Sequence, residues 1–392
     1  MSTAALPENM KRPMPQALVR TGWLLLALGL AIFLGAYASD ARRAAFDNVM
    51  LLLFLASLAA GSLFLVALEH IAGAVWSTPM RRIIEFLAGL TPILPLVGLP
   101  LLFHLDELFH WTHAGASGDA LLQGKMPYLN VPFFVIRFVA VCLLWLMFFW
   151  LFTRNSLKQD RSGDARLTTR NIRLAAAFLP VFAVTLTVTA IDWGMSLEPH
   201  WFSTIFGVYY FSGTALAAIA AATLAIVLLL DAGFLPQLRK DNLYSLGALM
   251  FAFVNFWAYI AFSQFLLIWY ANMPEETFWF MHRWENGWLV ISIILIVVHF
   301  GVPYFALLPQ EAKMDRNRLK LMAIWILFAH LLDLYWLIMP TFGKTVTLGW
   351  QELGIPLVAT GLVVLVFAWK MERHNLVPVG DPKLQRGLDF HL

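Results

Sequence analysis

The chain alternates between long hydrophobic runs and short polar segments. Ten of the runs reach the roughly 20 apolar residues that an α-helix needs to cross a bilayer. They lie near residues 19–38, 48–69, 83–104, 131–153, 174–193, 204–230, 243–270, 287–308, 320–340 and 351–370. We therefore expect an all-α polytopic membrane protein with ten transmembrane helices.

Composition supports the membrane class and limits the chemistry. Of 392 residues, 60% are hydrophobic and only 13% are charged, whereas soluble domains carry about 25% charged residues. Cys142 is the single cysteine, which excludes a disulfide, a thiolate-bound iron–sulfur cluster and a c-type haem attachment site within this chain. We expect lipids around the chain and no nucleic-acid partner.

The placement of lysine and arginine predicts the orientation. Most of these residues lie in the N-terminal segment, the loops after the even-numbered runs and the C-terminal segment, with the richest loop between Arg154 and Arg173. The positive-inside rule therefore predicts that both termini face the cytoplasm of a bacterial inner membrane. Residues 1–18 and 371–392 are expected to be poorly structured cytoplasmic arms on either side of a transmembrane domain at 19–370. The first run lacks a cleavage site and is interpreted as a retained helix.

His330 and Asp333 are the most informative polar residues, because they lie three residues apart inside the ninth hydrophobic run. Residues at this spacing share one helix face. Ionisable groups inside a membrane are costly, so they face a packed interior or a wet cavity and often carry protons or ions. We therefore predict a proton-transfer role for this pair.

Further polar residues extend this prediction to a discontinuous path across the membrane. Glu69 and His70 close the second run, His299 lies in the eighth, and Asp192 ends the fifth; all four are proton-transfer candidates. Arg137 is interpreted as an ion-pair partner of Asp192 or Asp333. The remaining supporting candidates form one stripe of the seventh run, either as contacts between helices or as a relay: Asn255, Tyr259 and Ser263.

Metal and haem binding are weakly supported. His104, His110 and His113 cluster in a polar loop without a zinc-binding spacing. No run carries two histidines at the spacing for stacked haems. We expect no metal site and no cofactor bound by this chain, with haem b through His70, His299 or His330 as the less favoured alternative.

Prolines predict irregular helices. Pro92, Pro95 and Pro100 fall in the third run, Pro180 in the fifth and Pro303 in the eighth. Each removes a backbone hydrogen bond and kinks or breaks a helix. Broken helices occur around transporter binding sites and also in inert bundles.

Two long motifs resemble a known family. The stretch from Ile191 to Gly207 (IDWGMSLEPHWFSTIFG) and the stretch from Phe262 to Trp279 (FSQFLLIWYANMPEETFW) closely resemble the ActF-type membrane subunit of alternative complex III, the bacterial quinol:cytochrome c oxidoreductase. The C-terminal Gly380–Leu384 (GDPKL) and Phe390–Leu392 (FHL) are similar to the ending of that family. The resemblance covers nearly the whole chain.

The resemblance implies a fold and a set of partners. Such subunits are similar to the NrfD-like membrane anchors of polysulfide reductase, so helices two to five and six to nine would form two four-helix bundles flanked by helices one and ten. The implied partners are a paralogous ActC-type membrane subunit, to which the quinol site is chiefly assigned, an iron–sulfur subunit and haem c subunits. The chain would then be a non-catalytic subunit without redox cofactors that packs against the paralogue and conducts protons.

Two alternatives remain. A stand-alone proton-coupled secondary transporter would show the same ten runs, buried charges and broken helices. In the second alternative, the chain binds quinol itself through an aromatic pocket near Trp193, Trp269 and Tyr270.

Overall fold

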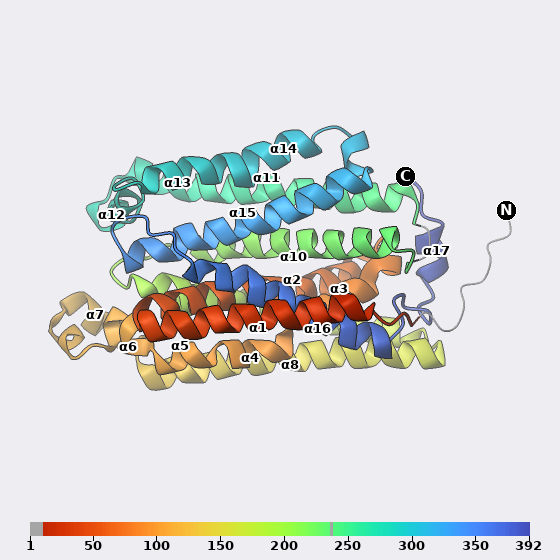
Figure 1. Ribbon diagram of the computed structural model, residues 1–392, viewed down its shortest axis with the longest axis horizontal. Coiled ribbons are helices and arrows are strands. Elements are labelled where there is room, and N and C mark those ends of the chain that lie inside the picture. Colours follow the sequence, from red (N-terminus) through yellow and green to blue (C-terminus); the bar gives the residue numbers. More distant parts are fainter. Residues whose placement is uncertain (1–10, 236–237) are drawn as a thin grey trace.

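The computed structural model describes residues 11–235 and 238–392. All regular secondary structure within these ranges is helical, which confirms the all-α prediction. Ten helical segments in the described part of the chain are long and apolar enough to cross a bilayer, and each coincides with a predicted run. They lie along the long axis of the molecule (Figure 1). The protein is therefore a multi-pass membrane protein.

Six of these segments are single, uninterrupted α-helices. They are α1 (Gln16–Ser39), α2 (Ala41–Ala72), α8 (Val131–Ser162), α10 (Phe206–Asp231), α11 (Lys240–Ala271) and α15 (Arg316–Phe342). The other four are interrupted or extended: Thr78–Phe103 with α3 (Arg81–Ala88), α4 (Leu94–Val97) and α5 (Leu99–Phe103); Arg166–Leu197 with α9 (Arg166–Thr189); Trp288–Leu307 with α13 (Trp288–Leu295) and α14 (Val302–Leu307); and Gln351–Arg373 with α16 (Gly354–Arg373).

The two ends of the molecule differ. One end carries the start of α1 and the short helix α17 (Leu384–Leu388), and we call it the terminal face (Figure 1). The opposite end carries α7 (Ala120–Lys125) and α12 (Pro274–His282), and we call it the far face. The short helix α6 (Leu105–Leu108) also lies at the far face (Figure 1).

Helices α2 and α10 form the centre of the structure. Within their most apolar windows, 94% and 83% of the residues are buried, against 17% for α1. The two helices approach closely at Gly61, where a Cβ atom would lie 2.7 Å from the Cβ of Ala218 and 2.8 Å from the carbonyl oxygen of Thr214. Small residues allow such close packing where water provides no driving force. Polar side chains in the middle of these helices, such as Ser57 on α2 and Thr214 on α10, are therefore buried inside the protein.

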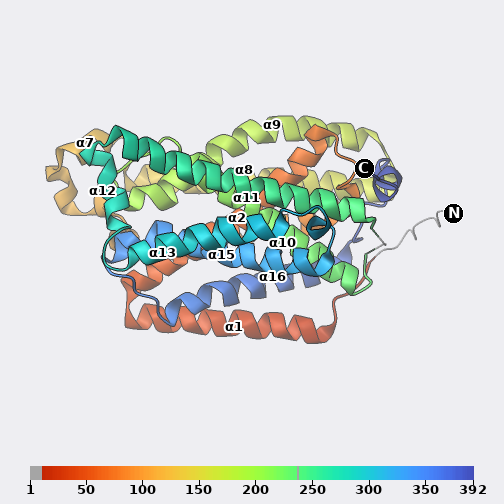
Figure 2. The ribbon, with the colours of Figure 1, turned by 90° about the horizontal axis from the view of Figure 1, so that it is seen from above.

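Helix α1 lies at the edge of the molecule beside α16 (Figure 2). Glycines bring the two backbones together: a Cβ at Gly361 would lie 2.7 Å from the backbone nitrogen of Leu26, and one at Gly29 would lie 2.8 Å from that of Val358. Most of α1 otherwise faces outward, as expected for a helix in contact with lipid or with another subunit.

The predicted helix irregularities are found, although not all at the prolines. The third span breaks into short helices around Pro92, Pro95 and Pro100. By contrast, α9 continues through Pro180, and its irregular turn comes later as a π-helical segment, η5 (Ala190–Gly194). A second π-helical segment, η7 (Ile296–Gly301), precedes Pro303. Single π-helical turns are frequent at functional sites, and these two contain Asp192 and His299.

The expectation of a poorly structured C-terminal arm is wrong. Leu376, Val377 and Leu384 are buried, and the carboxylate of Asp381 accepts a hydrogen bond from Arg81. The segment 374–392 therefore packs across the terminal face. Its polar composition concealed these contacts, because buried charges there are paired within the fold. Of the predicted N-terminal arm, residues 1–10 lie outside the described residues, and α1 begins at Gln16.

The grouping into two four-helix bundles stays a prediction. Helix α2 contacts α3, α8 and α9, and α10 contacts α11 and α15, as the grouping requires. However, α2 and α10 would belong to different bundles, and they share one of the most extensive interfaces in the protein.

Candidate functional site

The predicted pair on α15 lies in the protein interior. His330 and Asp333 have 1% and 2% of their surface exposed. Both face α10, where a Cβ at Gly213 would lie 3.0 Å from His330 Cε1 and 3.7 Å from Asp333 Oδ2. The three-residue spacing therefore placed both groups on one face, as predicted. That face is turned toward the central helices and away from lipid.

Two donors from different helices hold the carboxylate of Asp333. The hydroxyl of Tyr209 on α10 donates to Oδ1 at 2.5 Å, and the indole Nε1 of Trp257 on α11 donates to Oδ2 at 3.1 Å. Charge-assisted hydrogen bonds of this kind are stronger than neutral ones. They fix the orientation of the carboxylate and reduce the cost of its burial.

His330, one turn before Asp333 on α15, contacts a group of hydroxyls on α2 and α10. Its Nε2 lies 3.0 Å from Ser57 Oγ, and Ser57 Oγ lies 3.2 Å from the hydroxyls of both Tyr210 and Thr214. Tyr210 donates onward to the carbonyl of Leu53 at 2.7 Å. Hydroxyls both donate and accept, so this group can pass a hydrogen bond in either direction.

His299 reaches the same place from the π-helical segment η7. Its ring stacks on Trp257 with centroids 3.8 Å apart and lies 6.5 Å from the ring of His330. Among the described residues, neither nitrogen of His299 has a hydrogen-bond partner, and nor does the Nδ1 of His330. One ligand atom from each of His299, His330 and Asp333 lies within 4.8 Å of the others. We call these three residues the central triad.

The spacing within the triad favours water-mediated contact. No hydrogen bond joins its members in the described structure, and distances up to 4.8 Å exceed a direct bond. Two hydrogen bonds of about 2.8 Å through one water span this gap. Two imidazoles and a carboxylate around one water are suited to proton exchange, because each imidazole nitrogen and each carboxylate oxygen can accept a hydrogen bond or, when protonated, donate one.

The same three residue types can also ligate a divalent transition metal. However, both oxygens of Asp333 already accept hydrogen bonds, and Nε2 of His330 is directed to Ser57. A tetrahedral site also needs a fourth ligand. The hydrogen bonds that orient the triad therefore fit proton transfer better than metal ligation.

Glu69 and His70 form a second cluster at the terminal face. Glu69 accepts from Arg81 at 2.9 Å, and Arg81 also pairs with Asp381 at 2.6 Å. His70 lies 3.4 Å from the amide nitrogen of Asn171. Glu69 is thus part of a buried ion-pair network closed by the C-terminal segment, which sequence reasoning did not reveal.

Asp192 and Arg137 form a third cluster. Arg137 donates from Nε to Oδ2 at 2.6 Å and from its terminal nitrogen to Oδ1 at 3.1 Å. The guanidinium also packs 3.8 Å from the ring centre of Tyr128. Asp192 is therefore the partner of Arg137, one of the two predicted possibilities. Both of its oxygens are paired, so the structure does not join it to the central triad.

The stripe on α11 lies outside the site. Tyr259 is 66% exposed, and the amide of Asn255 donates to its own helix at Phe251. Ser263 is only partly buried. The inward face of α11 instead presents Trp257. Trp257 lies two residues from both Asn255 and Tyr259, so it belongs to a different face of the helix and was not among the candidates. Its role in holding Asp333 is visible only in the folded structure.

The histidine-rich loops of the far face form pairs with acids or carbonyls. His200 lies 2.6 Å from the carboxylate of Asp119, and His113 lies 2.6 Å from the carbonyl of Asp106. The hydrogen bond from His200 lowers the pKa of Asp119 below its usual range. Among the described residues, the three histidines His104, His110 and His113 do not bring their nitrogens to metal-binding distance.

The aromatic residues considered for quinol binding differ in their exposure. Trp193 is buried against Phe138 and Trp145, whereas Trp269 is 61% and Tyr270 is 85% exposed on α11.

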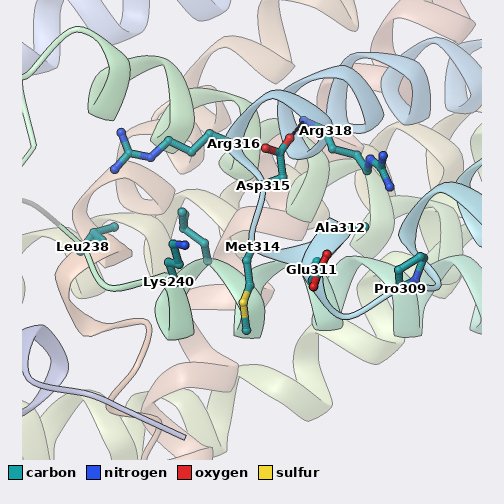
Figure 3. Close-up of a pocket in the computed structure, with 10 residues that line it drawn as sticks. Leu238, Lys240, Pro309, Glu311, Ala312, Met314, Asp315, Arg316 and Arg318 are labelled. Atoms are coloured by element: carbon teal, nitrogen blue, oxygen red, sulfur yellow. Dashed lines mark hydrogen bonds between the residues drawn. The ribbon is translucent and has the colours of Figure 1, made fainter.

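A cavity of about 940 Å³ opens at the terminal face between the start of α11 and the start of α15 (Figure 3). Its lining mixes both signs of charge, with Lys240, Arg316 and Arg318 beside Glu311 and Asp315. It contains none of the central triad, so we do not assign it to the same site.

Comparison with known proteins adds no further assignment. No family model matches the chain, and no curated protein matches it.

Proposed function

We propose that this chain is an integral membrane subunit of a quinol:cytochrome c oxidoreductase of the alternative complex III type, and that it conducts protons through its interior. The motif resemblance supports the complex, and the single observation that supports proton conduction is the buried central triad of His299, His330 and Asp333. In this proposal the chain is a non-catalytic subunit of the oxidoreductase.

The proposed surroundings follow from the same resemblance. The chain packs against a paralogous ActC-type subunit that binds quinol, with an iron–sulfur subunit and haem c subunits as further partners. The single cysteine is consistent with redox centres that lie in these partners. The basic terminal face lies in the cytoplasm of a bacterial inner membrane, in accordance with the positive-inside rule.

The triad is chemically suited to hold and pass a proton. Asp333 is oriented by two donors, and the adjacent imidazoles have nitrogens without partners. A proton on the carboxylate passes to an imidazole through a water molecule without movement of the helix backbone. Ionisable groups inside a membrane are most often found where such transfers occur.

A second candidate function is a stand-alone proton-coupled transporter. The two π-helical segments and the broken third span favour it, because interrupted helices line transporter sites. Purification from the native membrane separates the two. The subunit co-purifies with haem-bearing and iron–sulfur partners, whereas a transporter is isolated without them.

Turnover and proton release by the complex reconstituted in liposomes test the proposal. Asp333→Asn, His330→Ala and His299→Ala should each reduce proton translocation while quinol oxidation and assembly are preserved. Tyr259→Phe is the matched control, because this side chain lies on the outer surface of α11. Unchanged proton translocation in all three triad variants would show that the triad is structural.

A further inference from the structure

Asp47 is an unusual buried acid. It lies on α2 with 0% of its surface exposed, and neither carboxylate oxygen has a hydrogen-bond partner in the described part of the chain. Asp192 and Asp333, also buried, each accept two hydrogen bonds from side chains. Burial of a carboxylate without a donor is costly unless it carries a proton. The fold therefore retains at this position a group that packing alone would not favour.

The surroundings of Asp47 are polar and come from several elements. Tyr37 on α1 lies within electrostatic range, and its buried hydroxyl has no partner. Tyr335 on α15 lies within the same range. Next to Asp47 on α2, the carbonyl oxygen of the Asn48 side chain is also buried without a partner. These groups can surround a proton-bearing carboxylate or a water molecule that it contacts.

An ion pair separates Asp47 from the far face. Arg43, one turn earlier on α2, donates to Glu352 at 2.7 Å and to the carbonyl of Thr347 at 2.6 Å. Both members of the pair are only partly exposed, at 14% and 12%. Asp40, just before the start of α2, is a further charged neighbour of Asp47. On the other side of Tyr37, His104 stacks on the tyrosine ring and pairs with Glu107. Arg43 is therefore the nearby cation available to a deprotonated Asp47.

Asp47 shares two helices with the central triad. It lies ten residues before Ser57, which is about 15 Å along α2 toward the far face, and Ser57 contacts His330. Tyr335 follows Asp333 by two residues on α15 and lies near Asp47. Tyr335 therefore links the region of the triad to that of Asp47, whereas residues 49–56 of α2 between Asn48 and Ser57 are all apolar.

We infer that Asp47 is a second proton-binding carboxylate, which exchanges protons between the central triad and solvent at the far face. Asp47 releases its proton to water at that face, and the Arg43 guanidinium compensates the remaining negative charge. A proton from Asp333, passed through the hydroxyl of Tyr335 and through water, restores the acid. This inference rests on the proposed proton-conducting function and replaces Asp192 in the predicted path.

Proton release in the reconstituted complex tests the assignment. Asp47→Asn should lose most proton translocation with quinol oxidation preserved, and Asp47→Glu should retain it. Asp40→Asn is the matched control. Asp40 is an exposed acid seven residues away that caps α2, and asparagine can form the same helix cap. Normal translocation in Asp47→Asn together with loss in Asp333→Asn would overturn this inference and leave the proposed function intact. Normal translocation in both would overturn the proposed function.

Infrared spectroscopy gives a second readout that does not depend on turnover. The wild-type protein should show a protonated carboxylic acid band near neutral pH that shifts in Asp47→Glu and is absent in Asp47→Asn. If Asp47→Asn does not assemble, the band shift in Asp47→Glu decides the question. A wild-type spectrum whose acid bands are unchanged in Asp47→Glu would show that Asp47 binds no exchangeable proton.

Discussion

Replacement of Arg81 by methionine should destabilise the terminal face more than any single change to an exposed charge. Arg81 is 1% exposed and has three carboxylates within ion-pair distance, namely Asp381 at 2.6 Å, Glu69 at 2.9 Å and Glu85 at 3.4 Å. Methionine fills a similar volume but provides no donor. Glu85 keeps Arg82 as a partner at 3.1 Å, whereas Glu69 and Asp381 lose their guanidinium donor.

The expected magnitude follows from the burial of these partners. Removal of one member of a buried ion pair costs about 3–5 kcal/mol, because the other charge remains desolvated and unpaired. The side chains of Glu69 and Asp381 are 5% and 0% exposed, so solvent does not compensate either one. We therefore expect a loss of at least about 3–5 kcal/mol in the free energy of unfolding.

Unfolding in mixed detergent micelles, titrated with a denaturing detergent and followed by tryptophan fluorescence, measures this loss. Arg154→Met is the control, because Arg154 is exposed on α8 and its one described contact is with the ring of Trp150, 4.8 Å away. Such a contact contributes about 0.5–1 kcal/mol. Addition of Asp381→Asn to Arg81→Met removes an unpaired carboxylate and should recover part of the stability. If Arg81→Met and Arg154→Met differ by less than about 1 kcal/mol, the network does not stabilise this face as argued.

Three further predictions concern other parts of the fold. Asp192→Asn should cost about 3–5 kcal/mol in the same unfolding assay, because it leaves buried Arg137 without its carboxylate; a loss below about 1 kcal/mol would show that other contacts compensate the cation. Gly361→Leu should separate α1 from α16, since even a Cβ would lie 2.7 Å from the backbone nitrogen of Leu26. We expect a lower unfolding temperature and faster proteolysis between α1 and α2, and an unchanged cleavage rate would argue against this interface. Burial lowers the pKa of His374 from 6.5 to about 4, so the imidazole stays neutral in the fold and takes up a proton on unfolding. Stability should therefore fall as pH decreases from about 6.5 toward about 4. In His374→Asn, unfolding midpoints measured at several pH values should depend less on pH. If the pH dependence is the same in this variant, other groups cause it.

The pair on α15 shows how far local spacing carries a prediction. A separation of three residues places His330 and Asp333 on one helix face whatever the rest of the fold. The cost of a charge in lipid then predicts that this face points inward, as it does. The partner of Arg137 was likewise restricted to two acids by the need to pair a buried cation, and the structure selects Asp192.

The contacts that assemble the rest of the site were not accessible from the sequence. Tyr209 and Trp257 hold Asp333 from helices that are distant in the chain, and no periodicity marks either residue. His299 was a candidate from the sequence, but its approach to His330 and Asp333 depends on a π-helical segment that the sequence did not predict. Asp47 lies one residue before the hydrophobic run predicted at 48–69, where an acid indicates a solvated loop. The structure instead extends α2 to Ala41 and buries Asp47 completely.

The sequence by itself determined the class of the protein and the position of its ten membrane spans, because a lipid-exposed helix must satisfy its backbone hydrogen bonds internally and present an apolar surface. Both requirements concern a single segment, so the sequence of that segment is enough to predict them. Only the tertiary structure decided which polar groups meet, since that depends on how each helix is rotated against its neighbours. At Gly61, α2 lies close to the backbone of α10, and at Gly213 the absence of a side chain leaves room for His330 and Asp333 against α10.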